Sequence, residues 1–164
     1  MLPVCVAVLS AVPGTLGHLM ATTRDRLDDL FQRCADLGID VEWRDLGELR
    51  RGEFRRHANV IVLNRRLTTP QALSCLAHEL GHAFLGHGCS TPANEQRAWE
   101  YAAALVISPA EYAAAEARVG SEAPALALEL AVTPRLIEGW RRWWVTRGRS
   151  STHVENPQPT PSLV

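Results

Sequence analysis

The sequence is most constrained by one short stretch, residues 77–83, in which two histidines and a glutamate form an H-E-x-x-H motif. Its apolar neighbours recur at helical spacing, which predicts an α-helix here. Residues four apart share one helical face, so the rings of His78 and His82 would lie about 5–6 Å apart at Cβ. Two imidazoles at that separation can bind one small cation, with bonds of about 2.0–2.1 Å for zinc. Glu79 points in a slightly different direction, where it can take a proton from a metal-bound water without binding the metal itself.

A third metal ligand has to come from outside this stretch, and the spacing excludes one common source. The extended motif H-E-x-x-H-x-x-G-x-x-H needs a glycine at position 85 and a histidine at position 88. The chain has Leu85 and Gly88 there, and its nearest glycine and histidine are each displaced by one position. His87 is therefore interpreted as a histidine at the helix end or in the following loop.

The other source of a third ligand is a carboxylate of the next predicted helix. Glu95 lies in the first turn of that helix, and a short connection would bring this turn back toward the end of the motif helix. A His-His-Glu set leaves the fourth position for water, as in several zinc peptidases. The competing role for Glu95 is an interaction with its own helix N-terminus. Glu100, on another face, is the second choice as a metal ligand or as a neighbour of one.

Two segments together resemble a known family. One is L-A-H-E-L-G-H-A at residues 76–83, and the other is E-Q-R-A-W-E-Y-A-A at residues 95–103. An H-E-x-x-H helix followed by an E-x-x-A-(N/D)-x-(F/W)-A-A helix is typical of the ImmA/IrrE metallopeptidases. The resemblance is most specific over residues 58–109 and extends more loosely over residues 41–144. It implies a thermolysin-like α+β fold, a cytoplasmic location, and helix-turn-helix repressors as substrates, whose cleavage or inactivation releases mobile-element or stress genes.

Position by position, the resemblance implies that His78, His82 and Glu95 hold Zn²⁺ and that Glu79 is the catalytic base. The chain departs from the family pattern at Trp99, where the family usually has Asn or Asp. An amide or carboxylate there can accept a hydrogen bond from the free ring N–H of a ligand histidine and fix its orientation. Tryptophan cannot accept that bond. Either Glu100, another side chain or a backbone carbonyl substitutes for it, or the metal affinity is lowered.

Peptide hydrolysis also needs a donor for the developing oxyanion. The sequence offers Tyr101, Tyr112 and His57 as oxyanion or substrate contacts and does not choose among them, although packing is the preferred interpretation of the tyrosines. Cys75 precedes the motif by three residues and Cys89 follows it in the loop. Both are interpreted as buried or idle thiols rather than metal ligands.

Periodicity and capping signals predict the elements around the motif. They indicate a mostly helical α+β domain with a small antiparallel sheet packed on the motif helix, and the resemblance implies that this domain is zincin-like. The expected strands cover residues 39–43 and 59–64, with residues 47–57 forming a loop and the approach to another strand. The expected helices cover residues 22–37, 69–85 and 91–107, a short segment after Ser108, and a last helix opened by Thr133 and Pro134.

Length and composition predict one domain over residues 20–147. Residues 1–19 are expected to be a loosely ordered or disordered extension, with secretion as the alternative, and residues 148–164 a disordered tail. A net charge of −1 gives no global argument for a nucleic-acid partner. No two cysteines form a C-x-x-C pair and no apolar run is long enough to span a bilayer, so a cytoplasmic protein without a membrane partner is expected.

The C-terminal segment, residues 119–147, supports a second hypothesis because it resembles a helix-turn-helix. Its arginines could contact DNA or a repressor: Arg135, Arg141, Arg142 and Arg147, with Arg149 beyond. The preferred interpretation is a packing or substrate-docking helix pair that uses Trp140, Trp143 and Trp144. Two functions remain open. One is a zinc-dependent endopeptidase that cleaves a regulatory protein, such as a repressor of a phage, mobile element or stress response. The other is a non-catalytic DNA- or repressor-binding regulator on the same scaffold.

Overall fold

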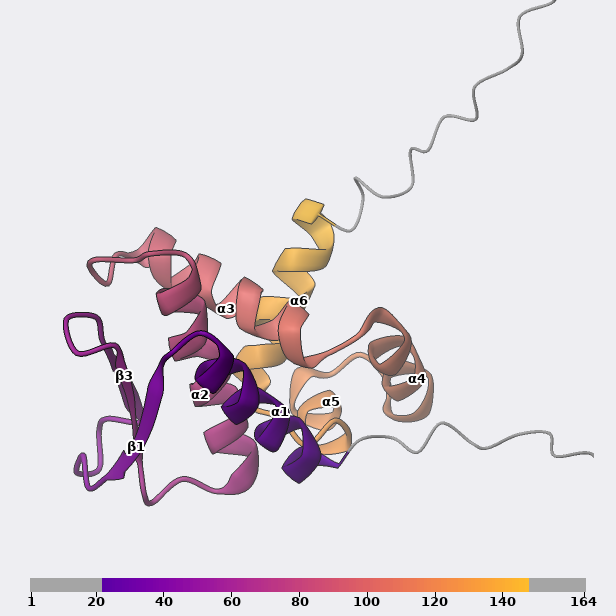
Figure 1. Ribbon diagram of the computed structural model, residues 1–164. Helices are drawn as coiled ribbons and strands as arrows, with labels where there is room; N and C mark the ends of the chain where they lie inside the picture. Colours follow the sequence, from indigo (N-terminus) through magenta and orange to yellow (C-terminus); the bar gives the residue numbers. More distant parts are fainter. Residues whose placement is uncertain (1–21, 148–164) are drawn as a thin grey trace, which may run out of the picture.

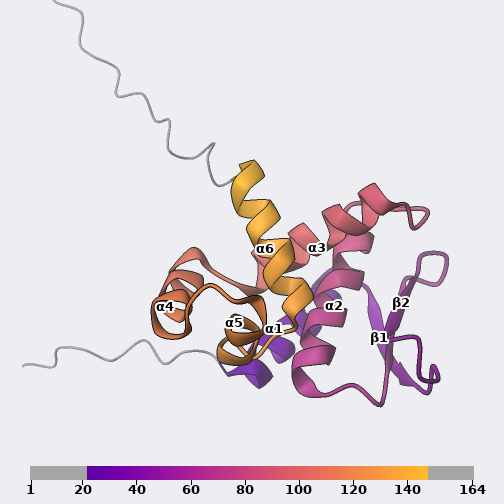
Figure 2. The same ribbon diagram turned by 180° about the vertical axis from the view of Figure 1, so that it is seen from behind.

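The computed structural model describes residues 22–147, so the predictions made for residues 1–19 and 148–164 lie outside the described part. Within it the chain forms six helices and a three-stranded sheet (Figures 1 and 2). This arrangement confirms the predicted α+β, mostly helical class. In chain order the elements are α1 (Thr23–Asp36), β1 (Asp40–Arg44), β2 (Gly52–Arg55), β3 (Val60–Asn64), α2 (Thr69–Phe84), α3 (Pro92–Val106), α4 (Pro109–Val119), α5 (Ala123–Glu129) and α6 (Pro134–Arg147).

The sheet is mixed, which corrects the prediction of an antiparallel sheet. Its order is β1-β3-β2, with β2 antiparallel to β3 but β1 parallel to β3. Ile61 in the central strand pairs with Val41 on one side and Phe54 on the other. An apolar run such as that of β3 fits a central strand in either direction, so the residues alone could not set the direction of β1. β2 is left as an edge strand.

The helix that carries the motif is the centre of the molecule. Every residue from Ala72 to Gly81 is buried, because α2 contacts β2 and β3 as well as α1 and α3. Leu73, Leu76 and Leu80 share the hydrophobic core with Ile61 of the sheet. Figure 1 shows α2 between the sheet and the remaining helices. A helix buried on all sides holds its polar side chains in fixed positions.

Two glycines let neighbouring helices approach closely. A Cβ added at Gly81 of α2 would lie 2.9 Å from the backbone oxygen of Ala98 in α3. A Cβ added at Gly139 of α6 would lie 2.6 Å from the backbone oxygen of Trp99 in α3. Side chains larger than hydrogen therefore have no room at either crossing. The helix α3 is consequently seated between α2 and α6 at a distance that only glycine permits.

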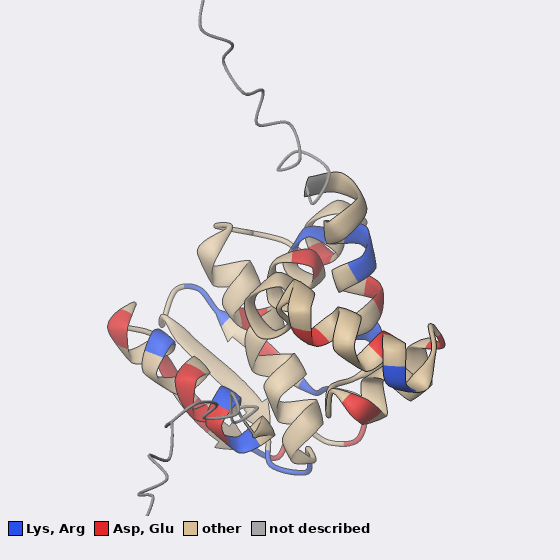
Figure 3. Cartoon of the chain, turned by 90° about the vertical axis from the view of Figure 1, so that its right-hand side faces the viewer, with Lys and Arg blue, Asp and Glu red and all other residues tan. Residues whose placement is uncertain are grey.

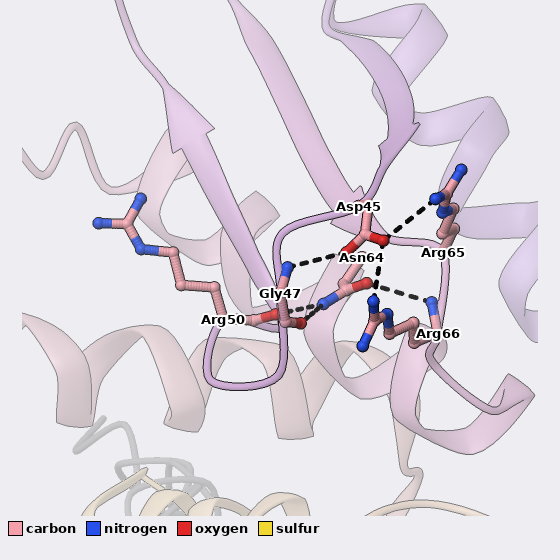
Figure 4. A network of polar contacts seen from close by, with 6 residues as sticks. All are labelled: Asp45, Gly47, Arg50, Asn64, Arg65 and Arg66. Atoms are coloured by element: carbon pink, nitrogen blue, oxygen red, sulfur yellow. Dashed lines mark hydrogen bonds and ion pairs between the residues drawn. The ribbon is translucent and has the colours of Figure 1, made fainter.

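The segment between β1 and β2 is tied to the end of β3 by a polar network (Figure 4). The buried Asn64 side chain donates hydrogen bonds of 2.7 Å to the backbone oxygens of Gly47 and Arg50. Asp45 accepts from the Gly47 backbone N–H and from the guanidinium groups of Arg65 and Arg66. These contacts fix the backbone that leads into β2.

Charged residues are interspersed along the chain. Both α1 and α6 carry acidic and basic side chains (Figure 3). None of the helices within residues 22–147 is both long enough and apolar enough to cross a membrane.

Candidate metal centre

The two motif histidines point their rings at one common position. They lie one turn apart on α2, and their Nε2 atoms are 3.1 Å from each other. Glu95 of α3 completes a triangle, with 3.2 Å from its Oε2 to His78 Nε2 and 3.2 Å from its Oε1 to His82 Nε2. Donor atoms bonded at about 2.0–2.1 Å to a tetrahedral ion are about 3.3 Å apart. The separations therefore fit three ligands of one small cation.

Glu95 reaches this position because of the local structure around it. The close crossing of Gly81 with Ala98, three residues after Glu95, brings the N-terminal half of α3 against α2. The Ser90 hydroxyl, in the loop before α3, donates a 2.6 Å hydrogen bond to Glu95 Oε1. Thr91 caps α3 by accepting from the backbone N–H of Asn94. Glu95 thus makes specific contacts with the histidines rather than acting only as a first-turn acidic residue.

The protonation states favour a metal site. Burial, followed by the neighbouring His82, lowers the pKa of His78 to about 4. Burial also lowers the pKa of His82. Burial raises the pKa of the Glu95 carboxyl, but the Ser90 hydrogen bond and the two histidines outweigh it, so the net shift is downward. At neutral pH the cluster therefore presents two neutral imidazoles and a carboxylate, which are the forms that bind metals.

Glu79 lies outside the ligand cluster but faces the same space. The group of side chains close enough to hold a metal ion consists of His78, His82 and Glu95. Burial raises the pKa of Glu79 to about 7, and the Phe54 backbone N–H, which donates to its carboxylate, partly offsets the effect. A carboxyl group with a pKa near neutrality can both accept and return a proton.

Two cavities open on the centre, one on each side. The larger, of about 720 Å³, runs from the centre toward the start of α6. The smaller, of about 430 Å³, runs toward the loop after α2. Both are lined by Gly52, His78, Glu79 and Glu95. The edge strand β2 therefore borders the centre, with Gly52 in both linings and Glu53 and Phe54 in that of the smaller cavity.

The structure gives the two histidines different supports, and one was missed from the sequence. His82 Nδ1 lies 3.0 Å from His87 Nδ1, so His87, which the sequence placed at a helix end, orients the second histidine. His78 Nδ1 is buried with no hydrogen-bond partner among the described residues. Instead the His78 ring stacks on Trp99, with ring centroids 4.1 Å apart and planes 20° apart. Trp99 therefore replaces the hydrogen bond of the family pattern with a stacking contact.

The other predicted site residues lie further from the centre. Glu100 accepts a 2.8 Å hydrogen bond from Gln96, and it is not part of the metal-capable cluster. Tyr101 stacks on Phe84 with ring centroids 4.8 Å apart. His57 is exposed in the turn between β2 and β3. Glu100, Tyr101 and His57 line neither of the two cavities.

The remaining oxyanion candidate and the two thiols also have defined places. Tyr112 is buried in α4, where it stacks on Trp140 and accepts a hydrogen bond from Arg141. Cys75 is buried in the wall of the larger cavity, and burial raises the pKa of its thiol to about 12. Cys89 is exposed and lines the smaller cavity. The two thiols are not part of the metal-capable cluster.

A family comparison agrees with this geometry. The pattern of the IrrE N-terminal-like domain, a peptidase family also named Peptidase_M78, matches residues 34–137. The chain belongs to this family. The IrrE-like match extends from the end of α1 to the first turn of α6, and so includes both helices that supply the cluster. A comparison with curated proteins found no match.

The C-terminal helices of the IrrE-like domain pack on the rest of the molecule. Trp140 of α6 donates a hydrogen bond to the backbone oxygen of Ile107 and stacks on Tyr112. Arg141 donates to Tyr112 Oη at 2.8 Å and to the backbone oxygen of Ser121. One of the arginines proposed to contact DNA is therefore already engaged within the domain.

Proposed function

We propose that the protein is a zinc-dependent endopeptidase. One observation carries the proposal: His78, His82 and Glu95 converge within 3.2 Å of one another, while Glu79 stands outside their cluster and faces both cavities. Two imidazoles and a carboxylate with a fourth position open are the donor set of catalytic zinc sites. When bound, zinc would polarise a substrate carbonyl and lower the pKa of a bound water toward about 7.

The residues of the chain would handle the proton and the substrate. Glu79 accepts a proton at its carboxylate and later returns it to the leaving amine. The Phe54 backbone N–H donates to that carboxylate and holds it at the edge of β2. The outer edge of β2 has no strand partner among the described residues. An extended peptide can pair with such an edge, which would lay its backbone across the centre.

The finer parts of the proposal rest on the resemblance to the ImmA/IrrE family. From that resemblance we propose that the substrate is a helix-turn-helix repressor of a phage, mobile element or stress response. We also propose that the protein acts in the cytoplasm. Tyr101 and His57 are retained as proposed substrate or oxyanion contacts only if a bound peptide reaches beyond the two cavities.

The test combines metal analysis with proteolysis. Purified protein is expected to contain one zinc per chain and to cleave an unfolded protein or a candidate repressor at defined bonds, as read by mass spectrometry. Glu79→Gln should keep its zinc and lose cleavage. Glu95→Gln should lose both. A wild-type chain without zinc, or a Glu79→Gln variant with unchanged cleavage, would overturn the proposal.

The second candidate function is a regulator that binds a repressor or DNA without cleaving it. Its supporting observation is the buried His78 Nδ1, which lacks the hydrogen-bond acceptor that normally supports a metal-ligating histidine. A chain that binds a repressor tightly, holds no zinc and cleaves nothing would favour this function.

A further inference from the structure

Outside the candidate metal centre, the larger cavity is lined by more arginines than carboxylates. Outside the centre itself, its charged lining residues are Arg50, Arg51, Arg135 and Glu138. Arg50 is paired with Glu53 at 3.1 Å. The side chains of Arg51 and Arg135 make no ion pair or hydrogen bond among residues 22–147. Neither guanidinium is therefore held in an ion pair, although Arg135 lies close enough to Glu95 for its charge to help lower the pKa of that carboxyl.

Arg135 is held in place by the aromatic residue that departs from the family pattern. Its guanidinium lies over the Trp99 ring, 4.9 Å from the ring centroid, and the same ring stacks on His78. Arg135 is close enough to the centre that its charge helps to lower the pKa of both His78 and Glu95. A cation over an aromatic ring is attracted by the ring and loses some of its freedom. The Trp99 ring thus fixes a positive charge beside the candidate metal centre.

The start of α6 adds to the positive potential at the same place. Arg135 lies in its first turn, where the helix dipole favours a negative charge, although Leu136 and Ile137 already donate their backbone N–H groups to Thr133. Thr133 also lines the cavity, and its buried Oγ1 has no partner among the described residues. The backbone N–H of Thr133 donates to Ser74 of α2, which anchors this turn to the motif helix.

Arg51 is placed by the polar network at the other wall of the cavity. Asn64 donates from its side chain to the Arg50 backbone oxygen and from its backbone to the Arg51 backbone oxygen, the latter at 2.8 Å. Figure 4 shows the side chain of Asn64 reaching this loop. Because Asn64 is itself buried, the backbone under Arg51 is fixed even though the arginine head is exposed.

We propose that this cavity is a subsite for an acidic side chain of the peptide substrate, with Arg135 and Arg51 determining the specificity. This inference rests on the proposed peptidase function, because that function is what identifies the ligand as a peptide. A guanidinium binds a carboxylate through two parallel N–H bonds, which a neutral amide cannot reproduce. Glu138 is the one carboxylate in the cavity outside the centre. It would repel an acidic substrate side chain, but the arginines outnumber it.

The experiment measures peptide binding so that it does not depend on turnover. Capped, fluorescently labelled hexapeptides of Ala and Ser, with Asp, Asn or Arg placed at each position in turn, are titrated onto the Glu79→Gln chain at low salt. At one position the Asp peptide should bind about threefold to tenfold more tightly than its Asn counterpart. Arg135→Gln should abolish this difference and Arg51→Gln should reduce it. Arg97→Gln, which removes the same charge from an exposed residue outside the cavity lining, should leave the difference unchanged.

Each other outcome is decisive. Equal binding of Asp and Asn peptides at every position, no binding of any peptide, or a preference that survives in the Arg51→Gln/Arg135→Gln double variant would overturn the subsite. A wild-type chain that cleaves peptides without acidic preference would remove the subsite and leave the peptidase proposal standing. Acid-selective binding by a chain that holds no zinc and cleaves nothing would keep the subsite and remove the peptidase proposal.

Discussion

The two histidines of the centre are supported in unequal ways. His82 is oriented by a direct contact with the ring of His87, whereas His78 is held by the face of Trp99. A contact between two ring nitrogens fixes the rotation of the imidazole and selects its tautomer. Stacking fixes the plane of a ring but not which nitrogen carries the proton. His87 is therefore the more specific of the two supports.

His87→Ala is expected to lower zinc affinity about tenfold or more, because the His82 ring loses the partner that orients it. The measurement is competition for zinc against a chromophoric chelator. His57→Ala is the matched control, because His57 is an exposed histidine that lines neither cavity. The zinc affinity of this variant should equal that of the wild type. Equal affinities for both variants would contradict the role of His87.

Glu79→Gln is expected to stabilise the metal-free protein at alkaline pH. The folded-state pKa of about 7 lies above the ordinary value of 4.5, so between these values the folded chain holds a proton that the unfolded chain has lost. The free energy of unfolding therefore falls as pH rises from about 4.5 to about 7 and stays low above that. The full effect is on the order of 3 kcal/mol as an upper bound.

Urea unfolding in chelator at about pH 5 and about pH 8 measures this effect. The glutamine variant should exceed the wild type at the higher pH, and the gap should shrink at the lower pH. A gap that does not depend on pH would show that the charge of Glu79 is not its cause.

At the scale of elements, the position of the third ligand depends on how closely helices cross. Glu95 reaches the histidines because Gly81 lets α3 approach α2. On the other side of α3, Gly139 lets α6 pack just as closely against it. The geometry of the centre is thus set by backbone spacing as much as by the ligands themselves.

Gly81→Ala is expected to destabilise the fold by about 1–3 kcal/mol, because the new Cβ would stand 2.9 Å from the backbone oxygen of Ala98. Helix propensity alone predicts the opposite sign, a gain of about 1 kcal/mol. Zinc affinity should fall too, since α3 carries Glu95. Urea unfolding in chelator and zinc competition measure the two effects. A more stable variant with unchanged affinity would contradict the close crossing.

The sequence predicted the helices better than the sheet. Thr-Pro pairs and the apolar spacing placed α2 and α3 to within one or two residues, because capping and periodicity are local signals. The direction of β1 was wrong because it depends on which strand lies beside it, and β2 falls in a stretch predicted mainly as loop. The role of His87 was missed because its contact depends on the conformation of the chain after α2. A histidine five residues after His82 was the available signal.

At the scale of the whole molecule, one ion would join two helices of the central layer. A ligand that binds only the folded chain stabilises it in proportion to the logarithm of its concentration over its Kd. The centre should therefore act as a stabilising link between α2 and α3 as well as a reactive site.

Saturating zinc, at about 100 times its Kd, is expected to stabilise the chain by about 2.7 kcal/mol. Chelator should lower the Tm accordingly, as followed by circular dichroism. Glu95→Gln should have a Tm nearly independent of zinc or chelator, because it lacks one ligand. The same zinc-dependent shift in this variant would show that the ion binds elsewhere.

All three candidate ligands fall within residues 78–95, on two consecutive helices, whereas the proton-handling Glu79 also depends on Phe54 from the sheet. In the proposed enzyme the metal ligands therefore belong to α2 and α3, whereas proton transfer by Glu79 also requires β2 to be docked against α2. It follows that a change that undocks β2 from α2 would impair the proposed proton transfer while leaving the three candidate ligands on their own two helices.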